Sequence, residues 1–115
     1  MPNLLMLVLY NLNHFEEVVA AWHDNGAAEL TIMDGLGTRL PWEQMRRDDL
    51  PLLPSIRDLL QSDDAPRRII FTTVPDHVVD PLIVATERVL GDLYERGNGT
   101  LIAIPVARIV GLREL

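Results

Sequence analysis

The stretch LLMLVLY at residues 4–10 is apolar at every position, and the architecture of the domain follows from it. It is short, and asparagine follows it at Asn11 and Asn13, which favours a strand over a helix. Successive side chains of a strand point to opposite faces of the sheet. A strand that is apolar at every position therefore predicts a sheet that needs cover on both faces.

A helix is predicted directly after this strand. Asn13 is expected to cap it, with Glu16 completing a capping box. Gly26 is expected to end it, because glycine favours helix C-termini. Its apolar side chains recur at helical spacing, at Phe15, Val18, Val19 and Trp22.

Three more strands and one more long helix complete the pattern. The second helix is capped by Asp76 or Asp80, a choice the sequence leaves open, and Pro81 suits the first helical position after Asp80. Residues 40–66 hold four prolines and two acidic pairs, which predicts a long surface loop with a short helix only at 55–61. The further strands are predicted at residues 29–34, 67–74 and 100–106.

The order βαββαβ predicts one α+β domain over residues 1–115, a ferredoxin-like antiparallel sheet with two helices on one face. The first and third strands are then central. The fourth strand is expected at an edge, since Pro105 cannot donate to a neighbouring strand. The face without helices would expose aliphatic surface, which predicts self-association. The alternative is that residues 40–66 cover it as a third layer.

Charge and composition exclude several classes of function. The formal charge of −7 opposes general nucleic-acid binding. All ten basic residues are arginine, so lysine chemistry and the P-loop lysine are absent, and the chain has no cysteine for disulfides or thiolate chemistry. The run at residues 4–10 is too short to span a membrane, so the sequence predicts a soluble, cytoplasmic protein without membrane insertion.

The glycines at Gly35 and Gly37 lie after the second predicted strand, and Thr38 and Arg39 follow them. They do not open a helix, so a dinucleotide-binding turn is not indicated. The simplest interpretation of an isolated Gly-x-Gly is a bend at the end of a strand.

Taken together, several features resemble the P-II nitrogen-regulatory family and its P-II-like superfamily. They are the βαββαβ order, the bend at Gly35-Leu36-Gly37, the long loop 40–66, the turn Gly97-Asn98-Gly99-Thr100 and the closing segment 105–111 (PVARIVG). The resemblance covers nearly the whole chain, and its motifs are short. It implies a homotrimer that binds adenine nucleotides in the cleft between subunits and contacts a partner protein through the long loop.

The resemblance also implies a set of ligand-binding residues. Thr100 stands where the family has a lysine, and Val110 stands where it has a second arginine. Without these two charges, the binding of a triphosphate is expected to be weaker by several kcal/mol, on the order of one charge-assisted hydrogen bond for each missing charge. Arg39 and Arg108 could still hold a smaller anion. The implied ligand-binding residues are Gly35, Gly37, Thr38, Arg39, Gly97, Gly99, Thr100 and Arg108.

The expected function is therefore a non-enzymatic signalling protein that binds a small ligand and signals through residues 40–66. No catalytic residue and no metal ligand is predicted, because His14, His23 and His77 lack partners at metal spacing. The first alternative is a trimeric scaffold that binds no ligand. The second is an enzyme with a cleft between subunits, which would need a cluster of titratable groups whose pKa values are perturbed.

Overall fold

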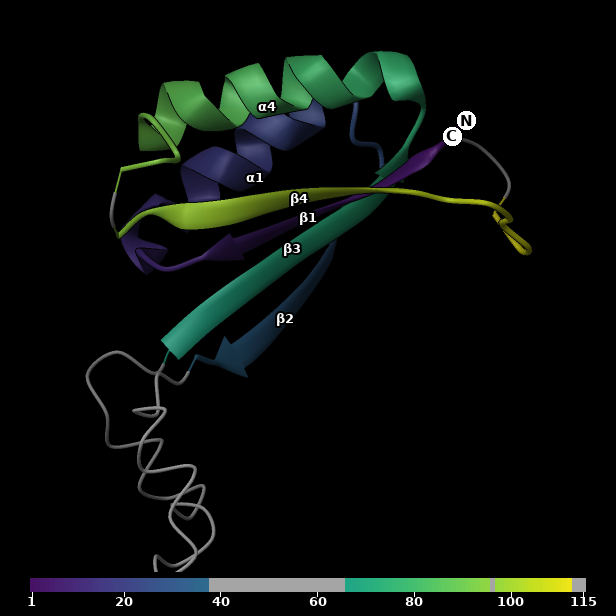
Figure 1. The fold of residues 1–115 in the computed structure, drawn as a ribbon. Coiled ribbons are helices and arrows are strands. Elements are labelled where there is room, and N and C mark those ends of the chain that lie inside the picture. Colours follow the sequence, from purple (N-terminus) through teal and green to yellow (C-terminus); the bar gives the residue numbers. More distant parts are fainter. Residues whose placement is uncertain (38–65, 96, 113–115) are drawn as a thin grey trace, which may run out of the picture.

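In the computed structural model, residues 1–37, 66–95 and 97–112 are described, and they form an α+β domain. Two helices, α1 (Phe15–Asp24) and α4 (Asp76–Leu90), cover one face of an antiparallel sheet (Figure 1). A short 3-10 turn, η1 (Leu12–His14), leads into α1. The strands are β1 (Asn3–Leu9), β2 (Thr31–Leu36), β3 (Pro66–Val74) and β4 (Gly99–Pro105).

The strand order of the sheet is β2-β3-β1-β4, and every pair is antiparallel. The prediction that the first and third strands are central and the fourth lies at an edge is confirmed. Each predicted strand boundary lies within two residues of the observed one. The arrangement is compatible with the predicted ferredoxin-like fold. The predicted helix at 55–61 and the possible third layer at 40–66 lie outside the described residues.

The core forms between the helices and the face of the sheet beneath them. Leu5, Leu7 and Leu9 alternate along β1 and are fully buried. Leu7 pairs with Ile70 of β3 and with Leu101 of β4, so the apolar side chains of the central strands form one layer. The helices contribute further buried side chains to this layer, namely Val18, Trp22, Leu82 and Leu90.

One buried hydrogen bond joins the two helices. The indole Nε1 of Trp22 on α1 donates to the hydroxyl Oγ1 of Thr86 on α4 at 2.8 Å. The same hydroxyl donates to the carbonyl oxygen of Leu82 at 2.7 Å. Both Trp22 and Thr86 have no exposed surface, so the bond satisfies an indole N–H that water cannot reach.

The opposite face of the sheet, here called the open face, is also apolar. On β1 it carries Leu4, Met6 and Val8, which are half-buried in the single chain. Neighbouring strands add side chains in register with them, such as Ile104 opposite Leu4 and Phe71 opposite Met6. The most exposed apolar members are Met33 (47%), Ile104 (44%) and Ile102 (40%). Both faces of the sheet are apolar, as the alternation on β1 predicted.

The predicted N-terminal helix caps are wrong. Asn13 lies inside η1, and the side chain of Asn11 accepts the Asn13 amide at 3.1 Å instead. Helix α4 already begins at Asp76, with the extended residue Pro75 before it and no side-chain cap. Pro81 therefore lies inside the helix, where its missing N–H removes one intrahelical hydrogen bond.

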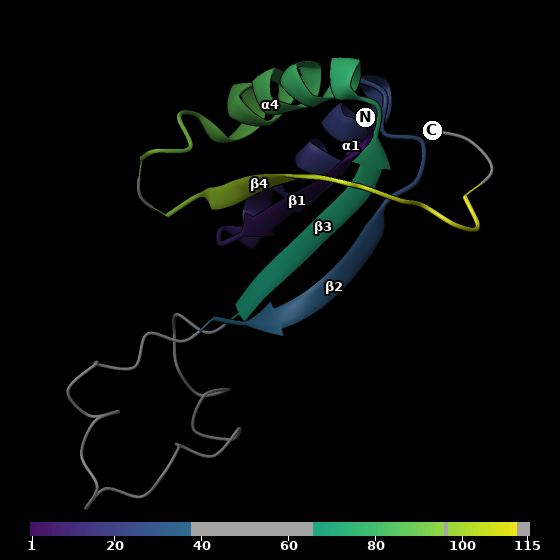
Figure 2. The ribbon, with the colours of Figure 1, turned by 45° about the vertical axis from the view of Figure 1, so that its right-hand side comes forward.

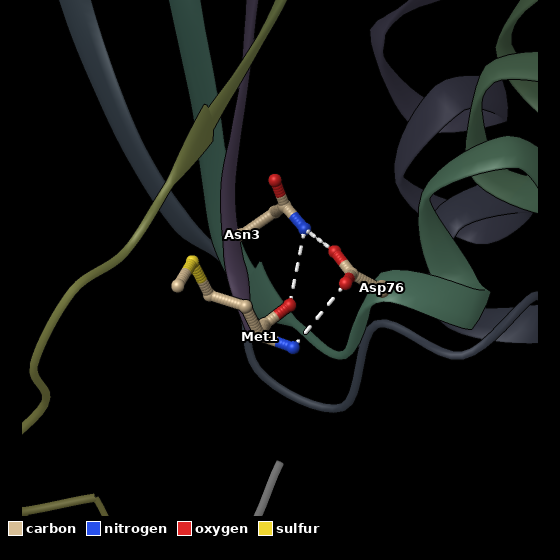
Figure 3. A network of polar contacts seen from close by, with 3 residues as sticks. All are labelled: Met1, Asn3 and Asp76. Carbon is tan, nitrogen blue, oxygen red and sulfur yellow. Dashed lines mark hydrogen bonds and ion pairs between the residues drawn. The ribbon is translucent and has the colours of Figure 1, made fainter.

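Asp76 is the first residue of α4 and not its cap, and its carboxylate binds the start of β1 (Figure 3). The N-terminal ammonium of Met1 donates to Asp76 Oδ2 at 3.2 Å, and the side-chain amide of Asn3 donates to Oδ1. The ammonium first, and then Asn3, hold the pKa of Asp76 below its ordinary value of 3.8. This network connects the start of β1 to the first turn of α4.

Replacement of Thr86 by valine should destabilise the protein by about 1–3 kcal/mol, because the buried indole N–H of Trp22 loses its acceptor. Urea unfolding at fixed protein concentration measures this loss. The matched control is Thr86→Ser, which keeps the hydroxyl and loses a methyl group worth about 1 kcal/mol. Equal stability of Thr86→Val and the unchanged protein would show that the hydrogen bond contributes nothing.

The Asp76→Asn variant should melt at a lower temperature than the unchanged protein at neutral pH. Because the pKa of Asp76 is lowered by folding, its carboxylate contributes stability above pH 3.8, and this contribution is lost as the pH falls through the folded-state pKa. The difference in Tm should therefore shrink in acid. Asp80→Asn, an exposed change on the same helix, is the control, and a pH-independent difference for Asp76→Asn would contradict the assignment.

Candidate functional site

All four predicted site glycines lie toward one end of the sheet, in or beside its two outer strands, β2 and β4. The register pairs Leu36 at the end of β2 with Pro66, and Leu9 at the end of β1 with Gly99. The ends of β1 and β2 therefore lie beside the starts of β3 and β4 (Figure 2). We call this the glycine end of the sheet, and its predicted site residues are Gly35, Gly37, Gly97, Gly99 and Thr100.

An arginine lies between the two glycine segments. The guanidinium carbon of Arg67, at the start of β3, stacks 4.6 Å from the centre of the Tyr10 ring. The Tyr10 hydroxyl is 2.6 Å from Oγ1 of Thr100 on β4. A methyl group placed on Gly37 would lie only 2.7 Å from Arg67 Nε, so a glycine there lets the guanidinium approach the backbone. Arg67, Tyr10 and Thr100 form what we call the Arg67 cluster.

Neighbouring Arg68 has a different environment, because adjacent residues of a strand point to opposite faces. Its Nε donates to Asp34 Oδ1 at 3.1 Å, and its guanidinium stacks 4.4 Å from the Phe15 ring of α1. Within the described residues, Arg67 makes no ion pair and donates only to the carbonyl oxygen of Pro66, at 2.9 Å. Since a guanidinium carries five donors, Arg67 keeps donors to which no other described residue offers an acceptor.

The glycines of this site have different local roles. A methyl group on Gly99 would lie 2.9 Å from the carbonyl oxygen of Val8, so close pairing of β1 and β4 requires glycine there. Gly97 has φ +93°, and a methyl group added to it would meet no described atom within 4 Å, so its turn requires only the positive φ. A methyl group on Gly35 would make ordinary contact with Ile69 at 3.5 Å.

Arg108 does not join this group within one chain. Strand β4 runs from the glycine end to Pro105, which pairs with Asn3 at the other end of the sheet. At a rise of about 3.4 Å per residue, Thr100 and Pro105 are about 17 Å apart, and Arg108 lies beyond them. Thr38 and Arg39, also predicted as site residues, lie outside the described residues.

Arg67 and Tyr10 were not among the predicted site residues. Arg67 and Arg68 are adjacent at the start of a predicted strand, so their side chains must lie on opposite faces of the sheet. The pair therefore indicated an arginine on each face. The contact of Arg67 with Tyr10 depends on the pairing of β1 and β3, which are far apart in sequence.

A second feature is a hollow of about 510 Å³ on the outer side of α1. It lies between the helix and the segment that leads into β2, and its lining is mainly apolar, with Phe15, Val19 and Leu30 among the lining residues. Charged or titratable groups also line it, namely Glu16, Asp24 and His23. Among the predicted site residues that the structure describes, none lines this hollow.

The described residues contain no group of three or more histidine, cysteine or acidic side chains that could hold a metal ion. Within the same part of the chain, no helix is long and apolar enough to cross a membrane. A scan against protein-family models and a search of curated proteins find no match to this chain.

Replacement of Gly99 by alanine should destabilise the fold by about 1–3 kcal/mol, because the new methyl group meets the backbone oxygen of Val8 at 2.9 Å. Gly35→Ala is the matched control within the sheet and should be neutral or slightly stabilising, since its methyl group meets only Ile69 at 3.5 Å. Urea unfolding compares the two. A Gly99→Ala variant as stable as Gly35→Ala would contradict the packing role of Gly99.

Proposed function

We propose that this chain is a P-II-like signalling protein that assembles as a homotrimer and binds a small anionic ligand between subunits. The observation that carries the proposal is the Arg67 cluster, in which an arginine without an ion pair among the described residues lies beside two glycine segments at one end of the sheet. Residues 40–66 follow this end of β2 closely and would carry the signal to a partner protein. The protein is proposed as a binding protein and not as an enzyme.

The open face supports self-association. Its members extend over all four strands, and Met33, Ile102 and Ile104 each leave at least 40% of their surface exposed in the single chain. Burial of apolar surface of this kind is favourable by about 25 cal/mol per Å². Identical copies that place their open faces around one axis would remove this surface from water and close the assembly.

The position of Arg108 supports a ligand site that is shared by two subunits. One chain places Arg67 and the glycines at one end of the sheet and Arg108 beyond the other end. A head-to-tail assembly brings the end of one copy beside the start of the next. In such an assembly, Arg108 of one subunit can face the Arg67 cluster of its neighbour.

The charges favour a compact anion. Thr100 provides no positive charge, and its hydroxyl already lies 2.6 Å from the Tyr10 hydroxyl. Val110 is apolar where the resemblance implies a second arginine. Two arginines and backbone N–H groups suit a carboxylate, a single phosphate or the diphosphate of an adenine nucleotide better than a triphosphate.

A scaffold that binds no ligand is the second candidate. Gly99 favours it, because close packing against Val8 explains this glycine without a ligand. The two candidates share the trimer and differ only in whether the glycine end binds an anion. Thermal melting with inorganic phosphate, ATP, ADP and dicarboxylates separates them, since a bound ligand raises Tm by mass action.

Removal of the guanidinium in Arg67→Gln should weaken binding of the anion that raises Tm most by about 10- to 100-fold, the effect of losing a hydrogen bond to a charged group. Isothermal titration calorimetry measures the loss. Arg108→Gln should have a similar effect if the site is shared by two subunits. The control is Arg88→Gln, an exposed change on α4 away from the glycine end.

Two results would count against the proposed function. Sedimentation equilibrium at micromolar concentration should give a trimer, and a monomer would remove the shared site. Unchanged affinity in both Arg67→Gln and Arg108→Gln would place the ligand elsewhere.

A further inference from the structure

The hollow on the outer side of α1, here called the α1 hollow, is separate from the proposed anion site. Its volume of about 510 Å³ is within the range of pockets that hold small organic molecules, about 300–1,000 Å³. Helix α1 lines it along its whole length, from Phe15 to Asp24. The helix lies on the side of the sheet opposite the open face (Figure 1), so self-association through the open face does not cover this hollow.

The lining of the α1 hollow is apolar midway along the helix. Val19 is half-buried there, and Leu30 contributes to the opposite wall. Ala20 and Ala28 are exposed and carry only methyl groups, which leaves room between the helix and the segment that leads into β2. An apolar chain placed along α1 would remove these surfaces from water, which is favourable.

A carboxylate lies near each end of the same helix. Glu16 is in the first turn of α1, and Asp24 is its last residue. Both side chains are exposed and line the α1 hollow. Their separation of eight residues corresponds to about 12 Å along the helix axis, at a rise of about 1.5 Å per residue. The hollow therefore offers two negative charges with an apolar surface between them.

Neither carboxylate has an arginine partner among the described residues. In this part of the chain Glu16 makes no ion pair, and the ion pair of Asp24 is with the imidazole of His23, at 3.6 Å between exposed groups. Arg68 stacks on the Phe15 ring, but its charge is already paired with a carboxylate of β2. The partial negative charge of a helix C-terminus further favours a cation beside Asp24.

We propose that the α1 hollow binds a linear diamine, with its apolar chain along α1 and one ammonium group beside each of Glu16 and Asp24. Such a dication matches the two separated charges, and its chain matches the apolar lining between them. The formal charge of −7 adds a long-range attraction for cations. A monoamine would leave one carboxylate unpaired, and a compact inorganic cation would leave the apolar lining in water. This site does not depend on the proposed function.

NMR titration of the isotope-labelled full-length chain with linear diaminoalkanes, from diaminobutane to diaminodecane, tests the proposal. The backbone amide signals of Ala20, Ala28 and Leu30 should shift, because these residues line the hollow. Affinity should rise by about twofold for each added methylene group, the effect of removing half of that group from water. The rise should end once the ammonium groups can lie about 12 Å apart. The monoamine octylamine should bind about threefold more weakly than diaminooctane, the effect of one exposed ion pair.

Variants of α1 locate the two ammonium groups. Glu16→Gln and Asp24→Asn should each weaken diaminooctane binding by about threefold and remove its advantage over octylamine. Glu17→Gln is the matched control, because it removes the same charge from the adjacent position, which does not line the hollow, and its affinity should be unchanged. Ala20→Leu fills the hollow from an exposed helical position, so it should weaken diamine binding without lowering Tm.

Three results would overturn the proposal, because each indicates a general attraction of amines to an acidic chain. They are amide shifts away from the α1 hollow, equal affinity for diaminooctane and octylamine, and an equal loss of affinity in Glu17→Gln and Glu16→Gln. The absence of any shift at millimolar diamine would overturn it as well. Anion binding at the Arg67 cluster should be the same in Glu16→Gln, so failure of the diamine site leaves the proposed function standing.

Discussion

The alternation of side chains along β1 governs both surfaces of the sheet. Leu5, Leu7 and Leu9 on one side form the floor of the core beneath α1 and α4 (Figure 1). Leu4, Met6 and Val8 on the other side are equally apolar, and no described helix covers them. One strand therefore contributes to the core and also to the second apolar face, the face for which we propose self-association.

The electrostatic contrast between Arg67 and Arg68 follows from the same geometry. Two adjacent arginines on a strand must leave it in opposite directions. The helix side provides Arg68 with Asp34 and the Phe15 ring. The open face provides Arg67 with an aromatic ring and a glycine, and within the described residues with no carboxylate. Among the described residues, the pairing of strands thus leaves the charge of Arg67 without an ion pair at the glycine end.

The site was only partly predictable from local patterns. The glycines mark strand ends and turns, so Gly35, Gly37 and Gly99 could be named without a structure. Arg67 and Tyr10 were missed because their contact joins strands whose pairing is not a local property. The cap predicted at Asp76 failed for a related reason, since its carboxylate binds groups across the fold instead of its own helix.

Hydrophobic periodicity along the chain was enough to establish the order of elements, the two apolar faces of the sheet and the central place of β1. The residues that share the glycine end, and the separation of Arg108 from them, became visible only in the folded chain. The physical reason is that side-chain contacts between strands depend on register, which brings together residues that are distant in the chain.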